Sequence, residues 1–392
     1  MASAEKVALY ASAGADLVQY DLDVDGAALV KRGSVTLPAG VQYAWQHASK
    51  KYCYVASSDR TPGAGTADGS THHLSAFRID PASGALTPHG KPVALRQRPI
   101  HMTTDIPSEH VLVAYSEPSA LSVHRINPDG TIGEEVRQPG PIDAGIYAHQ
   151  IRVAPSNTMA ILVTRGHDAK PGKAEDPGAL KVFKYRNGVL SDEVSVAPAG
   201  GYGFGPRHLD FHPSRPWVYV SLERQHKVWL FTLDGDKLSG EPLFSADTLA
   251  EPGNVRSRQL ASTIHVHPNG RFVYGAERAD TTVEVEGKRV FAGGENTIIA
   301  YAIDQGTGEP KFIQRIDTRG LHPRTFAIDP SGRVLIVANK SPVPVKDGSG
   351  VRIVPASLDV FRLGTDGKLD FVRKYDVDVG SGSMFWMGLM RL

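Results

Sequence analysis

A unit that recurs every fifty to sixty residues or so limits the possible folds of this sequence more than any other feature. One part of the unit is a six-residue, mostly apolar segment followed by a turn rich in Gly, Asp and Asn. Its seven copies are Leu17–Leu22, Leu74–Ile79, Leu121–Ile126, Leu180–Tyr185, Val228–Leu233, Ile298–Ile303 and Leu358–Leu363. Self-similarity at such a period is the signature of a repeat architecture.

A second part of the unit precedes six of these segments and joins two further apolar strands through a turn. The clearest copies are His208–Glu223, Ile264–Glu277 and Phe326–Asn339. Turn positions His47, Pro107, Pro155, Pro213, Pro268 and Pro330 are 60, 48, 58, 55 and 62 residues apart. Each period holds four strand-length segments, and no long segment shows a helical apolar period. Four short strands in each repeat are typical of a β-propeller blade.

The repeats therefore predict an all-β fold, a seven-bladed β-propeller. Because the chain begins with what would be a second strand, Val7–Ala13, one blade lacks its innermost strand. We expect the C-terminal segment Met384–Met390 to supply that strand, so that the ring closes and no strand edge stays exposed. No composition shift marks an internal boundary, and we expect residues 1–392 to form one propeller domain.

Composition and charge exclude several classes of function. The 43 Lys and Arg residues nearly balance the 42 Asp and Glu residues, which disfavours nucleic acid as a partner. Cys53 is the only cysteine, so the chain offers no internal disulfide and no multi-cysteine metal site. We see neither a secretory signal nor an apolar stretch long enough to span a membrane. We expect a cytoplasmic protein that is a monomer or small homo-oligomer.

Four long insertions rich in Gly, Pro and charged residues follow second strands. They are Asp59–His72, Gly166–Gly178, Ala279–Asn296 and Lys340–Ala356. A second strand ends at the rim where the first strand begins, so we expect all four at one mouth of the central channel. There they would either form the walls and lid of a ligand pocket or be plain surface loops. The glycines of Gly200–Gly205 precede a strand, which indicates a tight turn rather than a phosphate loop.

Polar side chains gather where first strands begin and second strands end. The candidates are His149, Gln150, Arg207, His208, Glu223, Glu277, His322 and Arg324. First strands line the channel of a propeller, so these groups are expected to converge near its axis. Guanidinium, imidazole and carboxylate groups around one cavity suit an anionic substrate and proton transfer. No specific metal motif is present and we expect no metal, although His167, Asp168 and Glu175 leave an insertion site open.

These segments also carry a resemblance to a known family. The sequence resembles the lactonase family of seven-bladed propellers, which includes propeller-type 6-phosphogluconolactonases and fungal carboxymuconate cycloisomerases. The resemblance is most specific at Ala148–Ser156, Gly205–Glu223 and His322–Lys340. It implies that His149, Arg207, Glu223 and Arg324 occupy the family's active-site positions, and that the chemistry needs no metal or organic cofactor.

Three functions remain open at this point. The first is hydrolysis of a small sugar-derived or dicarboxylate lactone, with arginines holding its anionic group and His149 or Glu223 deprotonating water. Further substrate contacts would come from Gln150, His208, Glu277 and His322. The second function is cyclisation of a carboxymuconate-type organic acid to a lactone by the same residues. The third is a non-catalytic binding propeller, because this fold hosts many unrelated functions.

Overall fold

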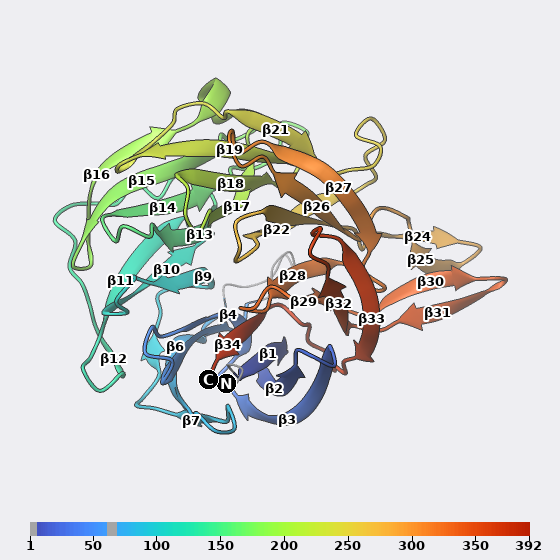
Figure 1. Ribbon diagram of the computed structural model, residues 1–392, viewed down its shortest axis with the longest axis horizontal. Helices are drawn as coiled ribbons and strands as arrows, with labels where there is room; N and C mark the ends of the chain where they lie inside the picture. Colours follow the sequence, from blue (N-terminus) through green and yellow to red (C-terminus); the bar gives the residue numbers. More distant parts are fainter. Residues whose placement is uncertain (1–5, 61–68) are drawn as a thin grey trace.

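The computed structural model describes residues 6–60 and 69–392, in which seven β-sheets of four or five strands are arranged in a ring around a central axis (Figure 1). Each of these sheets is one blade, and the strands of a blade lie side by side in order from the axis outward. The predicted all-β, seven-bladed propeller is confirmed. Within the described ranges, no helix has the length and apolar character needed to cross a lipid bilayer.

The first four blades share one order of strands, from the axis outward. Blade 1 holds β34 (Met387–Arg391), β1 (Val7–Ala13), β2 (Asp16–Asp23) and β3 (Ala28–Thr36). Blade 2 holds β4 (Gly40–Gln46), β5 (Tyr52–Ser58) and β6 (His72–Ile79), with β7 (Leu86–Pro88) and β8 (Val93–Ala94) outside β6. Blade 3 holds β9 (Pro99–Thr104), β10 (His110–Tyr115), β11 (Ala120–Ile126) and β12 (Ile132–Glu135). Blade 4 holds β13 (Ala148–Val153), β14 (Met159–Thr164), β15 (Ala179–Arg186) and β16 (Val189–Val196).

The remaining blades follow the same order. Blade 5 holds β17 (Pro206–Phe211), β18 (Trp217–Leu222) and β19 (Lys227–Asp234), with β20 (Lys237–Leu238) and β21 (Phe244–Asp247) outside β19. Blade 6 holds β22 (Leu260–Val266), β23 (Phe272–Arg278), β26 (Thr297–Ile303) and β27 (Pro310–Asp317). Blade 7 holds β28 (Pro323–Ile328), β29 (Val334–Asn339), β32 (Ser357–Leu363) and β33 (Leu369–Asp376). All seven repeated segments of the sequence are third strands: β2, β6, β11, β15, β19, β26 and β32.

The two ends of the chain close the ring in blade 1, as predicted. Strand β34 pairs antiparallel with β1, with Val7 opposite Arg391 and Ala11 opposite Met387. The strand begins three residues later than the sequence suggested. Trp386 lies before it and is tied to Ser12 by two hydrogen bonds of 2.9 and 3.0 Å. With this pairing blade 1 gains the innermost strand that the N-terminal segment lacks, and the ring is closed.

Buried tyrosine hydroxyls connect neighbouring blades. Tyr54 donates to the carbonyl of Gly130 at 3.1 Å, and Tyr219 donates to that of Gly308 at 2.7 Å. Tyr10 and Tyr274 make the same bond to Gly84 and Gly367. The four glycines lie in third-strand turns of the next blade with φ between 76° and 86°, a region that suits glycine. A buried hydroxyl needs a partner, so this bond fixes how each blade sits on its neighbour.

The insertions do not all lie where the sequence indicated. Two of them form the hairpins β24 (Thr282–Val285) with β25 (Lys288–Phe291) and β30 (Val343–Asp347) with β31 (Gly350–Val354). Figure 1 shows both hairpins extending away from the ring at blades 6 and 7. They do not cover the axis, so for these two insertions the alternative of surface loops holds. Most of the insertion predicted at 59–72 lies outside the described residues.

The glycine-rich segment before blade 5 is a turn, as predicted. A 3₁₀ turn, η1 (Pro198–Gly201), leads through residues 202–205 into β17. Gly200, Gly201, Gly203 and Gly205 all have positive φ, which explains the run of glycines. The segment leads into a strand, so it lacks the helix N-terminus that a phosphate loop uses.

Candidate functional site

A β-bulge occurs at the same position in the innermost strands of blades 4, 5 and 7. The residues left without a cross-strand partner are His149 in β13, Arg207 in β17 and Arg324 in β28. A bulge bends its strand and re-aims the side chain of the extra residue, and bulges are common beside active sites. Three blades thus present a chemically active side chain at the same height on the axis.

The backbone just before each bulge is held in a left-handed conformation. Tyr147, Gly205 and His322 have φ of 58°, 46° and 59° and lie two residues before the bulged residue. Positive φ is uncommon for residues with a side chain, and such strain concentrates at functional sites. The three carbonyls accept hydrogen bonds of 2.9, 3.0 and 3.1 Å from the backbone N–H groups of Arg165, Glu223 and Lys340. The residue after each second strand is therefore fixed beside a bulge.

Glu223 is the electrostatic centre of this group. One of its oxygens, Oε1, accepts from Arg207 Nε at 3.1 Å and from Arg278 Nη2 at 2.6 Å, while Oε2 pairs with Arg165. The Glu223 side chain is only 1% exposed. Burial alone would raise its pKa, but the three guanidinium groups hold the pKa well below its usual range. The carboxylate is ionised and fully engaged, so it is poorly placed to accept a proton from water.

Three buried histidines, His101, His149 and His208, lie within the electrostatic influence of Arg207. The ring centroid of His208 lies 5.1 Å from that of His149 and 5.8 Å from that of His101. Burial, followed by the charge of Arg207, lowers the pKa of both His149 and His208 well below its ordinary value. Within the described part of the chain, Nδ1 of His149 has no hydrogen-bond partner. His149 is therefore neutral near pH 7, and its buried Nδ1 is left without a hydrogen-bond partner among the described residues.

Positive charge exceeds negative charge around Arg324. Its guanidinium lies 3.6 Å from the centroid of the Phe385 ring and donates to the Phe385 carbonyl at 3.0 Å. Burial and then the neighbouring Arg207 and Arg278 hold the pKa of Arg324 well below its ordinary value. Burial and Arg324 lower the pKa of Lys340 to about 8. An anionic ligand would relieve this repulsion. We call Arg165, Arg207, Arg278 and Arg324, together with Glu223, His149 and His208, the arginine cluster.

Two of the predicted substrate contacts have different surroundings. His208 joins the cluster, with Nδ1 3.4 Å from Nη1 of Arg207. Gln150 lies next to His149, but its Oε1 accepts from the backbone N–H of Leu209 at 2.6 Å. This bond joins β13 to β17, so Gln150 connects two blades and its carbonyl oxygen is already in use.

Another two predicted contacts lie outside the cluster. Nδ1 of His322 is 2.9 Å from Oδ2 of Asp280, and burial lowers the pKa of this histidine to about 3. Its backbone positions the bulge of β28, whereas its side chain pairs with the start of an insertion. The carboxylate of Glu277 accepts from His226, Thr248 and Gln259 at 2.5–3.1 Å. These contacts hold Glu277 between blades 5 and 6, and the structure does not bring it to His149.

A one-residue register shift between repeats explains the error at Glu277. Tyr219 in β18 and Tyr274 in β23 make the same bond to the next blade, so they are equivalent positions. Counting four residues onward from each places Arg278, not Glu277, at the position of Glu223. Successive residues of a strand point to opposite faces, so this shift exchanges the two side chains.

Sequence reasoning missed Arg165 and Arg278 as members of the cluster. A positional signal for Arg165 was present, because it follows β14 directly, just as Glu223 follows β18. Beside Arg165, the insertion at residues 166–178 does approach the cluster. The ring of His167 lies 5.2 Å from that of Tyr147, and Arg165 lies 4.1 Å from the same Tyr147 ring.

The insertion residues left open as a metal site are engaged by other groups. His167 is 2.9 Å from Asp176, Asp168 pairs with Arg224, and Glu175 accepts from the backbone of Gly203. The three insertion residues thus have separate partners. One compact group elsewhere is Asp105, Glu109 and His110. There Asp105 already accepts from two backbone N–H groups, the His110 ring and the Tyr185 hydroxyl, so its oxygens are occupied.

Comparison with known proteins identifies the family. The model of the family described as "Lactonase, 7-bladed beta-propeller" matches residues 6–345. The chain belongs to this family. It is 27% identical over 274 residues to a 6-phosphogluconolactonase of Bacillus subtilis strain 168, covering 68% of this chain and 70% of the relative. It is 25% identical over 373 residues to a 6-phosphogluconolactonase of Serratia proteamaculans strain 568, covering 93% of each.

Solved structures show the same fold. A periplasmic gluconolactonase of Pseudomonas aeruginosa aligns with a TM-score of 0.72 at 20% identity. The alignment covers 98% of this chain and 99% of that one. The family resemblance drawn from the sequence is thereby confirmed.

Proposed function

We propose that this protein hydrolyses a small sugar-derived lactone that carries an anionic group, and that the arginine cluster performs the reaction. The observation that carries the proposal is the pairing of a neutral imidazole with surplus guanidinium charge. Nδ1 of His149 is unpaired within the described residues, and the nearby Glu223 is already bound by three arginines. Such a site offers a proton acceptor together with strong anion stabilisation.

In the proposed mechanism, His149 takes a proton from a water molecule as the water oxygen attacks the carbonyl carbon of the lactone ring. The carbonyl oxygen becomes an oxyanion in the tetrahedral intermediate, and a guanidinium of the cluster stabilises it. When the intermediate collapses, the bond between the carbonyl carbon and the ring oxygen breaks. His149 then returns the proton to the leaving oxygen, which yields an open-chain hydroxy acid.

The two bulged arginines are suited to different tasks. Arg207 is 1% exposed and held by Glu223, so its position is fixed before the substrate arrives. This fixed donor suits the oxyanion, because pre-organised groups need no reorganisation during the reaction. Arg324 is only partly buried and held on one side by the carbonyl of Phe385. It suits the phosphate or carboxylate of the substrate, which guanidinium groups bind in a bidentate manner.

Names of the relatives favour hydrolysis over the cyclisation reaction, because the proteins compared above are named as lactonases. The same residues could move a proton to carbon, but no specific observation supports that reaction. A cytoplasmic location and a monomeric or small oligomeric state stay predictions, and one of the solved structures is titled a periplasmic protein.

The proposal is tested by pH-stat titration of acid release from a panel of aldonolactones, both phosphorylated and plain. The wild-type protein should release acid above the spontaneous rate. Arg207→Ala should lower turnover by about 100–1,000-fold, the usual cost of one oxyanion donor. Arg32→Ala is the matched control, because Arg32 lies on the outermost strand of blade 1 with its side chain 54% exposed. Spontaneous rates with every lactone would overturn the proposal.

A further inference from the structure

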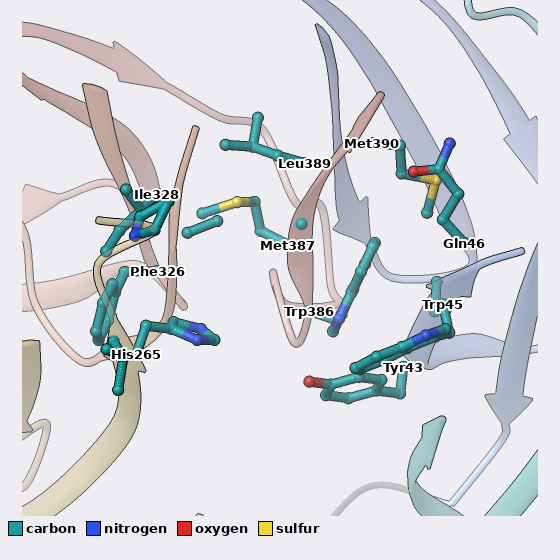
Figure 2. Close-up of a pocket in the computed structure, with 15 residues that line it drawn as sticks. Tyr43, Trp45, Gln46, His265, Phe326, Ile328, Trp386, Met387, Leu389 and Met390 are labelled. Carbon is teal, nitrogen blue, oxygen red and sulfur yellow. The ribbon is translucent and has the colours of Figure 1, made fainter. Parts of the chain in front are cut away.

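The structure has an open cavity at the other end of the axis. A cavity of about 300 Å³ opens between the inner strands β4, β22, β28 and β34 (Figure 2). Its lining includes Gln46, Val266, Ile328 and Met390, which lie at or near the ends of these strands. The arginine cluster lies where the inner strands begin. Because the innermost strands of all blades run in the same direction, the cavity and the cluster occupy opposite ends.

The walls of this cavity are aromatic and aliphatic. Figure 2 shows Tyr43, Trp45 and Trp386 on one side, with Phe326 and His265 facing them from the other. Aliphatic side chains complete the lining: Ile328, Met387, Leu389 and Met390. Flat rings on opposing walls favour a flat ligand, since aromatic pairs add about 0.5–1.5 kcal/mol beyond their burial.

Two polar groups point into the cavity. In Figure 2 the hydroxyl of Tyr43 and the ring of His265 approach its centre from opposite sides. Nδ1 of His265 lies 3.5 Å from Oδ2 of Asp210, which directs the proton of that nitrogen toward the carboxylate. Nε2 is then the acceptor on the cavity side. Burial raises the pKa of Tyr43 to about 12, so its hydroxyl keeps its proton and can donate.

No Lys, Arg, Asp or Glu lines this cavity in the described part of the chain. Arg152 and Asp210 lie behind the walls, Arg152 5.4 Å from the ring centroid of Trp45 and Asp210 beside His265, and they pair with each other at 3.2 Å. Burying an uncompensated charge is costly, so a charged ligand would find no partner here. An uncharged ligand meets the aromatic walls without that cost.

Packed aromatic and imidazole rings separate the cavity from the arginine cluster. The ring of Tyr43 lies 3.9 Å from that of His101, and His101 in turn contacts His208 of the cluster. His101 is 1% exposed, so these rings fill the axis between the two ends. A molecule in the cavity therefore touches Tyr43 but not His149.

We infer that the cavity is a second binding site, for an uncharged aromatic compound that carries a hydroxyl group. The ring of the ligand packs between Phe326 and the tryptophans, and its hydroxyl donates to Nε2 of His265 and accepts from Tyr43. Binding here is independent of the reaction proposed for the arginine cluster. Cavities of this size that combine apolar walls with oriented polar groups are typical of small-molecule sites.

The test is isothermal titration calorimetry of the intact protein with 4-methylphenol, and with 4-methylbenzoate as the charged analogue of similar shape. We expect saturable binding of the phenol and at least roughly tenfold weaker binding of the benzoate. Leu389→Trp, which fills the cavity, should abolish phenol binding. His265→Phe removes the acceptor but keeps the ring and should weaken binding by about 3–10-fold. Trp229→Phe is the matched control, because Trp229 stacks on Phe204 in blade 5, away from the cavity.

Thermal melts of each variant show whether it is folded. If Leu389→Trp melts at a lower temperature than wild type, the test relies on His265→Phe, because that substitution preserves the shape of the cavity wall. Equal or tighter binding of the benzoate would overturn the inference, as would the absence of saturable phenol binding. Unchanged phenol binding by a folded Leu389→Trp variant would also overturn it. Acid release from lactones bears only on the other end of the axis, so the two proposals fail separately.

Discussion

The two ends of the propeller axis differ in chemistry although the same seven repeats build both. At one end, bulges place His149, Arg207 and Arg324 toward the axis. The buried carboxylate of Glu223 there forms ion pairs with three arginines. At the other end, β4 pairs regularly from Tyr43 onward, and plain alternation puts Tyr43 and Trp45, two residues apart, into the cavity wall. The inner strands of blades 2, 3 and 6 also carry a register shift, so a repeat gains a reactive end only where the irregularity coincides with a reactive side chain. The regular part of the strands supplies an apolar lining.

The largest expected effect is a loss of turnover at the arginine end that leaves ligand binding at the other end unchanged. His149→Gln removes the proposed base while roughly keeping the side-chain volume, and turnover should fall by about 100–10,000-fold. Binding of 4-methylphenol at the other end should not change, because His101 and His208 lie between His149 and the cavity. Initial rates in the pH-stat and one calorimetric titration check both statements. Wild-type turnover by the folded variant would remove His149 from the mechanism.

A second prediction compares the carboxylates of the two ends. Glu223→Gln leaves three guanidinium groups without their shared counter-charge at a position that is 1% exposed. The free energy of unfolding should drop by about 3–5 kcal/mol. Asp210→Asn should cost less, because Asp210 is 15% exposed and pairs with one arginine. Urea unfolding of both variants measures the difference, and equal losses would contradict the assignment of Glu223 as the centre of the cluster.

A third prediction concerns what the arginine end recognises. Arg324→Gln should raise KM for a phosphorylated lactone by about 10–150-fold, the range of a hydrogen bond to a charged group. KM for the plain lactone should change far less, and phenol binding at the aromatic cavity not at all. Steady-state kinetics with the two lactones measure the ratio. An equal rise in both KM values would show that Arg324 does not hold the anionic group.

The smallest expected effect is a pH dependence that originates at the arginine end. The pKa of His149 and His208 is lowered in the fold, chiefly by burial, so below about pH 6.5 the unfolded chain binds more protons than the folded protein. Stability should therefore be complete above pH 7 and fall as the pH drops from about 6.5, by up to about 1.4 kcal/mol per pH unit for each histidine. His208→Gln should flatten this slope in urea unfolding between pH 7 and 5.

The lowered pKa of His149 also predicts how activity depends on pH. Because His149 stays neutral well below its ordinary pKa, kcat/KM should remain flat as the pH falls from 7 toward 6. An acid limb centred at or above pH 6.5 would contradict this. Such a limb would mean that His149 titrates like a solvent-exposed histidine.

Sequence patterns were sufficient to predict the ring of seven blades and to propose the reactive side chains at the beginnings of inner strands. Repeats depend on local turns and strand lengths, so the seven third strands could be placed one by one, and ring closure followed from the incomplete first blade. His149, Arg207 and Arg324 could be proposed because they begin strands that must line the axis. Their exact orientation depends on bulges, which no pattern in the sequence announced.

Other features depend on contacts between blades and could not be predicted. Glu277 and Arg278 differ by one position, and only the bond from Tyr274 to the next blade fixes which of them is equivalent to Glu223. The aromatic cavity escaped notice because its lining residues come from four inner strands, each of which reads as an ordinary apolar strand. The direction of the insertion hairpins depends on how they pack on each other, as in the bond from Lys288 to Ser349.

One measurement tests most directly whether the reaction takes place at the arginine cluster and not in the aromatic cavity. It is acid release from a phosphorylated lactone by His149→Gln and by Leu389→Trp, measured in parallel with wild type. Both substitutions lie on the axis, one at each end. We predict that His149→Gln loses turnover by at least about 100-fold. Leu389→Trp should retain the wild-type rate. Loss of turnover in a folded Leu389→Trp variant, with His149→Gln still active, would place the reaction in the aromatic cavity and contradict the account.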